Sequence, residues 1–216
     1  MADEQSGQLD LPPTLPVRRI LVIGSGAIGV AFLPALVSTL VWQYQAQVRV
    51  VLTSSATDLV SARSLAAISR HPVSGPGWPA EAAAGPAHVR LAEWAELVLA
   101  WPATLSFCAR CAYGMTTDLA SATLVAADAP VLVAPSLARS VATGATFGRI
   151  RTMLTEAGVT VVGPVQGRGV ADTAVGPGAC VSIAQLLRTA AAAGRGTTGH
   201  GASGAGDDAP DTSTIH

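Results

Sequence analysis

Five short runs of aliphatic residues constrain the fold of this chain more than any other feature. They are RRILVIGS (18–25), QVRVVLTSS (47–55), ELVLAWPA (96–103), PVLVAP (130–135) and VTVVGP (159–164). Segments with helical character separate them, and strands that alternate with helices form a parallel sheet covered on both faces. Near-continuous hydrophobicity is typical of such buried strands. The sequence therefore predicts an α/β fold, a Rossmann-like open parallel sheet with helices on both faces.

The two ends of the 216-residue chain differ in composition from the part between them. Residues 1–16 are acidic and proline-rich, and residues 193–216 are rich in Gly, Ser and Asp. Such segments cannot bury a core, so we expect a disordered arm and a disordered tail around one domain at 17–192. VQGRGVADTAVGPGA (165–179) contains four glycines. A loop of this length usually has a function, and we expect a flap near residues 165–180.

Charge and cysteine content exclude several classes of function. A formal net charge of -1 without a basic cluster predicts no binding to nucleic acid. No apolar run approaches the roughly 20 residues that cross a membrane, and the N-terminus lacks the features of a signal peptide. We therefore expect a cytoplasmic protein with no membrane contact. Cys108 and Cys111 lack a second pair or a nearby histidine, so two buried thiols on a helix are favoured over a redox dithiol, and no metal site is expected.

The first expected strand leads into a glycine-rich turn, GSGAIG. Gly24, Gly26 and Gly29 match the dinucleotide-binding pattern G-x-G-x-x-G. That pattern also needs an acidic residue about 20 positions later to hold a ribose, and hydroxyl residues stand there instead, at positions 53 to 55. Hydroxyls beside a glycine turn and a helix N-terminus suit a terminal monophosphate, so FMN is favoured over a nicotinamide cofactor. The alternative is that the glycines only let the helix pack closely on the sheet.

The segment from Ala87 to Leu119 is expected to bring polar groups to one edge of the sheet. His88 precedes a short amphipathic stretch, and the next strand ends in Pro-Ala-Thr before a helix. Ligands of open α/β sheets bind at the carboxyl ends of the strands. We therefore expect His88 and Thr104 to face one crevice.

These residues and their spacing resemble the homo-oligomeric flavin-containing cysteine decarboxylases over roughly residues 18–187. That family includes phosphopantothenoylcysteine decarboxylase and the enzymes that act on C-terminal cysteines of lanthipeptide and related precursors. The histidine, Trp94, the Pro-Ala-Thr segment, Gly114 and Asp118-Leu119 keep the family spacing. The resemblance implies a flavoprotein fold in which FMN is bound at three strand ends, by Gly24, Ser25, Gly26, Thr53, Ser55, Pro102, Ala103, Thr104 and Ser106.

His88 matches the active-site histidine of that family. An imidazole can accept the proton of a substrate thiol near neutral pH. The resemblance implies that the flavin then oxidises the cysteine at Cβ to a thioaldehyde, after which carbon dioxide leaves and an ene-thiolate remains. Without the resemblance, a structural histidine would be the simpler interpretation.

The end of the fourth expected strand departs from the family pattern. The family has Pro-x-Met-Asn-x-x-Met-Trp or a close relative, and the asparagine helps to hold the substrate carboxylate. The matching stretch here is PSLARSVA, with Ala138 and Ala142 in place of the asparagine and the tryptophan. Arg139 can bind a carboxylate bidentately if its side chain points inward, and we expect Arg139 and Ser136 to bind substrate. A solvent-facing Arg139 is the alternative.

The flap departs as well, because Asp172 stands where phosphopantothenoylcysteine decarboxylases carry a cysteine that reduces the ene-thiol. Cys180 lies several residues further on. An enzyme without that reductant stops at the ene-thiol. The sequence therefore favours FMN-dependent oxidative decarboxylation of the C-terminal cysteine of a precursor peptide, in the biosynthesis of an aminovinyl-cysteine-containing product. The alternatives are the coenzyme A pathway decarboxylase, a non-catalytic FMN-binding subunit or regulator, and an unrelated flavin reductase.

The resemblance also bears on partners. Its members form trimers or dodecamers with FMN at subunit interfaces, which implies a homo-oligomer here; closed symmetric assembly is in any case common. The expected partners are the C-terminus of a precursor peptide and, as candidates, other biosynthetic enzymes.

Overall fold

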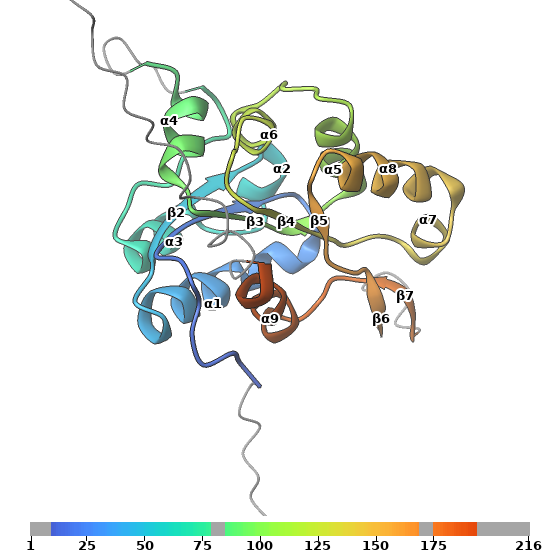
Figure 1. The fold of residues 1–216 in the computed structure, drawn as a ribbon, viewed down its shortest axis with the longest axis horizontal. Coiled ribbons are helices and arrows are strands. Elements are labelled where there is room, and N and C mark those ends of the chain that lie inside the picture. The colour runs from blue at the N-terminus through green and yellow to red at the C-terminus, as the bar shows by residue number, and fades with distance from the viewer. Residues whose placement is uncertain (1–9, 79–84, 169–174, 194–216) are drawn as a thin grey trace, which may run out of the picture.

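The computed structural model of the chain describes residues 10–78, 85–168 and 175–193. Its centre is a five-stranded sheet (Figure 1). The strand order is β2-β1-β3-β4-β5, and every pairing is parallel. The strands are β1 Arg19–Gly24, β2 Gln47–Leu52, β3 Leu97–Ala103, β4 Val131–Pro135 and β5 Thr160–Val161. The predicted fold class is confirmed. Since the chain winds outward in both directions from β1 and β3, the switch point at which open sheets bind ligands lies between these two strands.

One face of the sheet is covered by two helices from the first third of the chain and by the last described helix. These are α1 (Leu33–Ser38), α3 (Ala62–Ser69) and α9 (Ile183–Ala193), which bury leucines against Ile20 and Val22 of β1. A 3-10 turn, η1 (Ile28–Phe32), precedes α1, and a π turn, η2 (Thr39–Gln43), follows it. Pro34 lies in the first turn of α1, where its missing N–H costs nothing.

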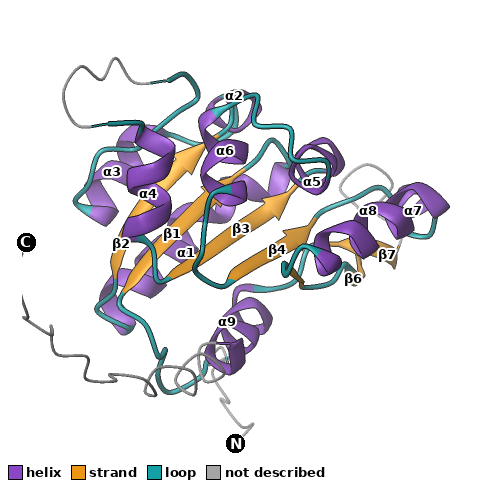
Figure 2. Ribbon diagram, turned by 45° about the horizontal axis from the view of Figure 1, so that its top comes forward, coloured by secondary structure: helices purple, strands orange, loops and turns teal. Residues whose placement is uncertain are grey.

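The opposite face carries α4 (Ala87–Trp94), α5 (Leu105–Ala112), α6 (Leu119–Val125) and α8 (Ala145–Glu156), so that helices lie on both sides of the strands (Figure 2). Single-turn helices α2 (Ser54–Thr57) and α7 (Arg139–Ala142) follow β2 and β4. Cys108 and Cys111 lie buried on α5, where burial raises the pKa of each thiol to about 12. The interpretation of this pair as core thiols is confirmed. Within the described ranges, no helix is long and apolar enough to span a bilayer.

The prediction of a disordered arm is wrong for residues 10–16. Leu11 and Leu15 pack against the core on the α1 side of the sheet. The hydroxyl of Tyr44 donates a hydrogen bond to the carbonyl of Pro12 (2.7 Å), and Arg188 forms an ion pair with Asp10 (2.9 Å). Leucines among the prolines thus supply enough apolar contact to order the segment. Residues 1–9 and the expected tail from 194 onward lie outside the described residues.

The segment after β5 is not the plain loop that the sequence predicted. β5 has only two residues, and the chain then forms an antiparallel hairpin of β6 (Val165–Arg168) and β7 (Val175–Ala179). Glycine and proline have low strand propensity, so sequence pattern does not indicate these strands. Residues 169–174, which include Asp172, lie outside the described part of the chain.

Candidate functional site

A chain of hydrogen bonds joins the carboxyl ends of four strands. The N–H of Thr53 donates to the carbonyl of Gly24 (3.1 Å), which links the loop after β2 to that after β1. The N–H of Ser25 donates to the carbonyl of Pro102 (3.3 Å), and that of Ser136 to the carbonyl of Ala103 (2.8 Å). The structure therefore brings the sequence-predicted residues at these strand ends together: Gly24, Ser25, Gly26, Thr53, Ser55, Pro102, Ala103, Thr104 and Ser136.

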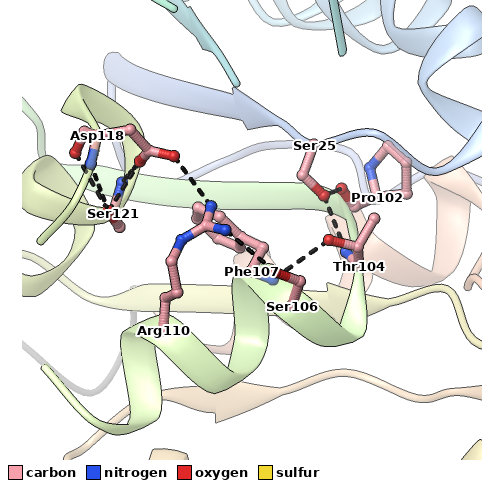
Figure 3. A network of polar contacts seen from close by, with 8 residues as sticks. All are labelled: Ser25, Pro102, Thr104, Ser106, Phe107, Arg110, Asp118 and Ser121. Carbon is pink, nitrogen blue, oxygen red and sulfur yellow. Dashed lines mark hydrogen bonds and ion pairs between the residues drawn. The ribbon is translucent and has the colours of Figure 1, made fainter. Parts of the chain in front are cut away.

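Ser25 holds the loops after β1 and β3 in register through its side chain. Its hydroxyl is buried, donates to the carbonyl of Pro102 (2.9 Å) and accepts from the N–H of Thr104 (2.8 Å), as Figure 3 shows. Thr104 in turn caps α5 by accepting from the N–H of Phe107 (3.2 Å). Ser25 therefore fixes the position of the N-terminal turn of α5.

Arg110 is a polar residue of this edge that the sequence analysis missed. Its guanidinium donates to the hydroxyl of Ser106 (3.1 Å) and pairs with Asp118 (2.9 Å), which caps α6 (Figure 3). Ser106 is exposed at the start of α5. The spacing of Arg110 four residues after Ser106 on one helix is the signal that could have indicated this contact.

The residues around Gly26 fit the phosphate of the FMN that the sequence predicts. The Thr53 hydroxyl is buried and has no hydrogen-bond partner within the described part of the chain, so it can meet a ligand. A methyl group on Gly26 would collide with Cβ of Ser55 and lie 3.2 Å from the Ser55 carbonyl carbon. The glycine thus lets two hydroxyl-bearing loops approach each other.

The other two glycines of the motif have different roles. A methyl group on Gly24 would lie 2.9 Å from the Leu33 and Leu52 side chains, whereas one on Gly29 would lie 3.7 Å from Pro102, an ordinary contact. The alternative interpretation, that the motif serves close packing, is therefore right for Gly24. Gly29 is not required by its surroundings.

Gly26→Ala is expected to weaken FMN binding by about tenfold or more, because overpacking costs about 1–3 kcal/mol and about 1.4 kcal/mol corresponds to tenfold. Titration of the apoprotein with FMN, followed by flavin fluorescence, measures this. Gly148→Ala is the control, since Gly148 is exposed on α8 and a methyl group there meets nothing within 4 Å. Equal FMN affinity of the two variants would contradict the assignment of Gly26.

A pocket of about 690 Å³ lies beside this edge, on the α1 side of the sheet. Such a volume suits a small molecule or a short segment of peptide. Its walls come from η1, the loop after β4, the β6–β7 hairpin and the start of α9, and they are mostly apolar or backbone. Trp101 belongs to the wall, and its indole N–H donates to the carbonyl of Val181 (2.9 Å). The predicted substrate residues Ser136 and Arg139 both line this pocket.

Arg139 combines the two alternatives from the sequence, because it is exposed and also lines the pocket. Its guanidinium lines the pocket and at the same time donates to the carbonyl of Val175 on β7 (3.3 Å). Arg139 is therefore held at the pocket wall by the hairpin.

Cys180 also lines the pocket. Its thiol lies 3.5 Å from the carbonyl of Ala134, and burial raises its pKa to about 12. Cys180 is therefore a protonated thiol at neutral pH.

His88 lies on the first turn of α4, on the other face of the sheet from the pocket. Nδ1 of His88 is buried and has no hydrogen-bond partner within the described ranges. The Trp78 ring packs against the imidazole edge-to-face, with ring centroids 5.5 Å apart and planes at 88°. Among the described residues that line the pocket, neither His88 nor Thr104 is present. A single chain therefore does not bring His88 to Arg139.

Comparisons with known proteins agree with this fold. The family model described as Flavoprotein matches residues 11–193. The coenzyme A biosynthesis bifunctional protein CoaBC of Vibrio parahaemolyticus is 35% identical over 175 residues, which are 81% of this chain and 43% of that protein. CoaBC of Escherichia coli (strain K12) is 34% identical over 165 residues, 76% of this chain and 40% of that protein. The chain thus spans less than half the length of these curated relatives.

Two solved structures extend the comparison. A PPC decarboxylase variant complexed with pantothenoylaminoethenethiol superimposes with a TM-score of 0.70 at 22% identity, over 80% of this chain and 95% of that one. The FMN-dependent cysteine decarboxylase SpaF gives a TM-score of 0.68 at 29% identity, over 81% of this chain and 97% of that one. The resemblance noted in the sequence is therefore confirmed. Because the family model matches nearly all of the described residues, the chain belongs to the flavoprotein family.

Proposed function

We propose that this protein is an FMN-dependent decarboxylase that acts on the C-terminal cysteine of a precursor peptide. Its product is an ene-thiol, an intermediate in the biosynthesis of an aminovinyl-cysteine-containing peptide. Membership of the flavoprotein family and the similarity to FMN-dependent SpaF confirm the prediction of FMN as the cofactor. The observation that carries the choice of substrate is the pocket, whose largely apolar wall includes two cations, Arg139 and Arg168, and the polar residue Ser136.

Each protein group has a defined task in this proposal. Arg139 binds the C-terminal carboxylate, since a guanidinium matches the two oxygens of a carboxylate. Ser136 donates a hydrogen bond to the same end of the peptide. His88 accepts the proton of the substrate thiol, which makes the sulfur electron-rich. Bound FMN supplies the two-electron oxidation at Cβ, and the bond to the carboxylate then breaks to release carbon dioxide.

We propose further that the active protein is a homo-oligomer, a trimer or a dodecamer. His88 and the pocket lie on opposite faces of one sheet, so a second copy is needed to place an imidazole beside a bound substrate. A symmetric assembly repeats the same contact at each interface. The precursor peptide, and other enzymes that modify it, are the remaining proposed partners.

The second candidate is decarboxylation of phosphopantothenoylcysteine, because CoaBC proteins are similar to this chain over most of its length. That reaction ends in a saturated thiol and, in the resembling family, uses a reducing cysteine. Cys180 is the cysteine in the pocket wall among the described residues. Its raised pKa and its contact with Ala134 do not favour a role as reductant. A non-catalytic subunit remains a third candidate, on the strength of Ala138 and Ala142.

The candidates are separated by supplying the purified protein with both substrates, a peptide that ends in cysteine and phosphopantothenoylcysteine, and identifying the products by chromatography and mass spectrometry. We expect consumption of the peptide, and the same ene-thiol product from Cys180→Ser, because the thiol has no step in the proposed reaction. Preference for phosphopantothenoylcysteine, with a saturated product that requires Cys180, would establish the second candidate. Flavin binding without turnover of either would establish the third.

A further inference from the structure

The β6–β7 hairpin packs on the segment after β4 through a face without side chains. Gly176 and Gly178 are two residues apart on β7, so they face the same side of the strand, and both are buried. The N–H of Leu137 donates to the carbonyl of Gly178 (2.8 Å). Gly178 has φ +123°, and a methyl group there would collide with the carbonyl of Leu137. Gly178 is therefore required for the hairpin to dock at all.

Gly176 has a different neighbour, the guanidinium of Arg139. A methyl group on Gly176 would lie 2.8 Å from Cζ and 3.0 Å from Nη2 of Arg139, and it would collide with Nε. Nη2 donates to the carbonyl of the adjoining residue, Val175 (3.3 Å). The guanidinium therefore lies against the backbone of β7, in the space that a side chain at position 176 would fill.

The charge of the pocket wall indicates that the pocket selects anionic ligands at the position where the Arg139 guanidinium contacts β7. The described wall residues include two cations, Arg139 and Arg168, and no Asp or Glu. A guanidinium loses little freedom on binding a carboxylate if its position is already fixed. The pocket is therefore expected to bind anionic ligand groups in preference to neutral ones beside the Arg139 guanidinium.

We propose that Gly176 is a positioning residue for Arg139, and that it makes the pocket selective for peptides with a free C-terminal carboxylate over their amides. The proposal rests on the proposed function, in which Arg139 binds that carboxylate. In the resembling family, the asparagine after the fourth strand helps to hold the substrate carboxylate. In this protein, the β6–β7 hairpin contributes to that role by positioning Arg139.

Binding of an unreactive peptide, with serine in place of the terminal cysteine, tests the proposal on the FMN-loaded protein. Gly176→Ala is expected to lower the affinity for the free acid about tenfold and to leave that for the amide nearly unchanged. In the Arg139→Ala background, Gly176→Ala should cause no further loss, because a residue that acts through Arg139 has nothing left to position. Gly148→Ala is the matched control. Additive losses, or equal losses for acid and amide, would overturn the proposal.

A second readout needs no substrate. The Nη–H resonances of Arg139, assigned by their absence from the NMR spectrum of Arg139→Ala, are expected to be protected from solvent exchange in the unmodified protein, where Nη2 donates to the carbonyl of Val175, and unprotected in Gly176→Ala. Unchanged protection in Gly176→Ala would overturn the positioning role. If Gly176→Ala loses the protection but the peptide acid does not bind the unmodified protein, the proposed substrate is rejected. Gly176 would still be the residue that positions Arg139.

Discussion

His88→Asn is expected to retain bound FMN and to lose decarboxylation. Asparagine is similar in shape to part of the imidazole ring, but its amide cannot accept a proton. Proton transfer by a positioned side chain contributes about 10²–10⁴-fold to a rate. Single-turnover kinetics with a cysteine-terminated peptide measure the loss, and the absorption spectrum measures the flavin. His71→Asn is the control, because the contacts of His71 with Ser69 use its backbone. Normal turnover by His88→Asn would remove His88 from the mechanism.

The same variant tests whether two copies build each site. Co-expression of equal amounts of His88→Asn and Arg139→Ala chains should restore activity, because about a quarter of randomly assembled sites receive an intact histidine from one copy and an intact arginine from another. The doubly substituted chain, co-expressed with either single variant, should give no more activity than that single variant gives alone. Failure of the two single variants to complement would contradict an active site shared between copies.

Arg139→Ala is expected to lower the affinity for peptides with a free C-terminal carboxylate by about 10- to 100-fold, since hydrogen bonds to charged groups contribute about 1.5–3 kcal/mol. The affinity for an amidated peptide should change little, because an amide offers no negative charge to the guanidinium. Arg139→Lys should recover only part of the loss, as an ammonium lacks the planar fork. Calorimetry with the serine-terminated peptides gives both affinities.

The control for Arg139 is Arg149→Ala, because Arg149 is exposed on α8. Loss of binding in that variant would indicate a general effect of net charge. Equal losses for the acid and the amide in Arg139→Ala would place Arg139 outside the carboxylate site.

The parts of the fold that sequence predicts are those set by local pattern. β1, β3 and β4 are buried along nearly their whole length, so their apolar runs leave one reasonable interpretation. The loops that follow them gather at one edge because parallel strands end on the same side. The clustering of Gly24, Thr53 and Pro102 is therefore a direct consequence of the strand order.

What the sequence could not show depends on contacts between distant residues. Ser25 and Thr104 are 79 positions apart, and Arg139 and Val175 are 36 apart. No periodicity links such pairs, so the sequence left open which way Arg139 points. The hairpin escaped prediction because glycines that permit close packing on Leu137 and Arg139 also resemble the glycines of an irregular loop.

The placement of His88 was missed for a related reason. Ala87–Trp94 is a short helix that starts after a proline, and nothing in its sequence states which face of the sheet it covers. Only the packing of Ala87 and Leu91 against Leu21 and Ile23 decides that. The separation of His88 from the pocket, and with it the argument for a second copy, comes from the structure alone.

The mass of a peptide that ends in free cysteine, measured after incubation with the FMN-loaded protein under air, tests the central claim most directly. The account predicts a loss of about 46 Da, which corresponds to carbon dioxide and two hydrogens and is the signature of oxidative decarboxylation. An unchanged peptide mass across varied sequences, with a loss of about 44 Da from phosphopantothenoylcysteine instead, would contradict it, because carbon dioxide alone would then leave and the product would be saturated.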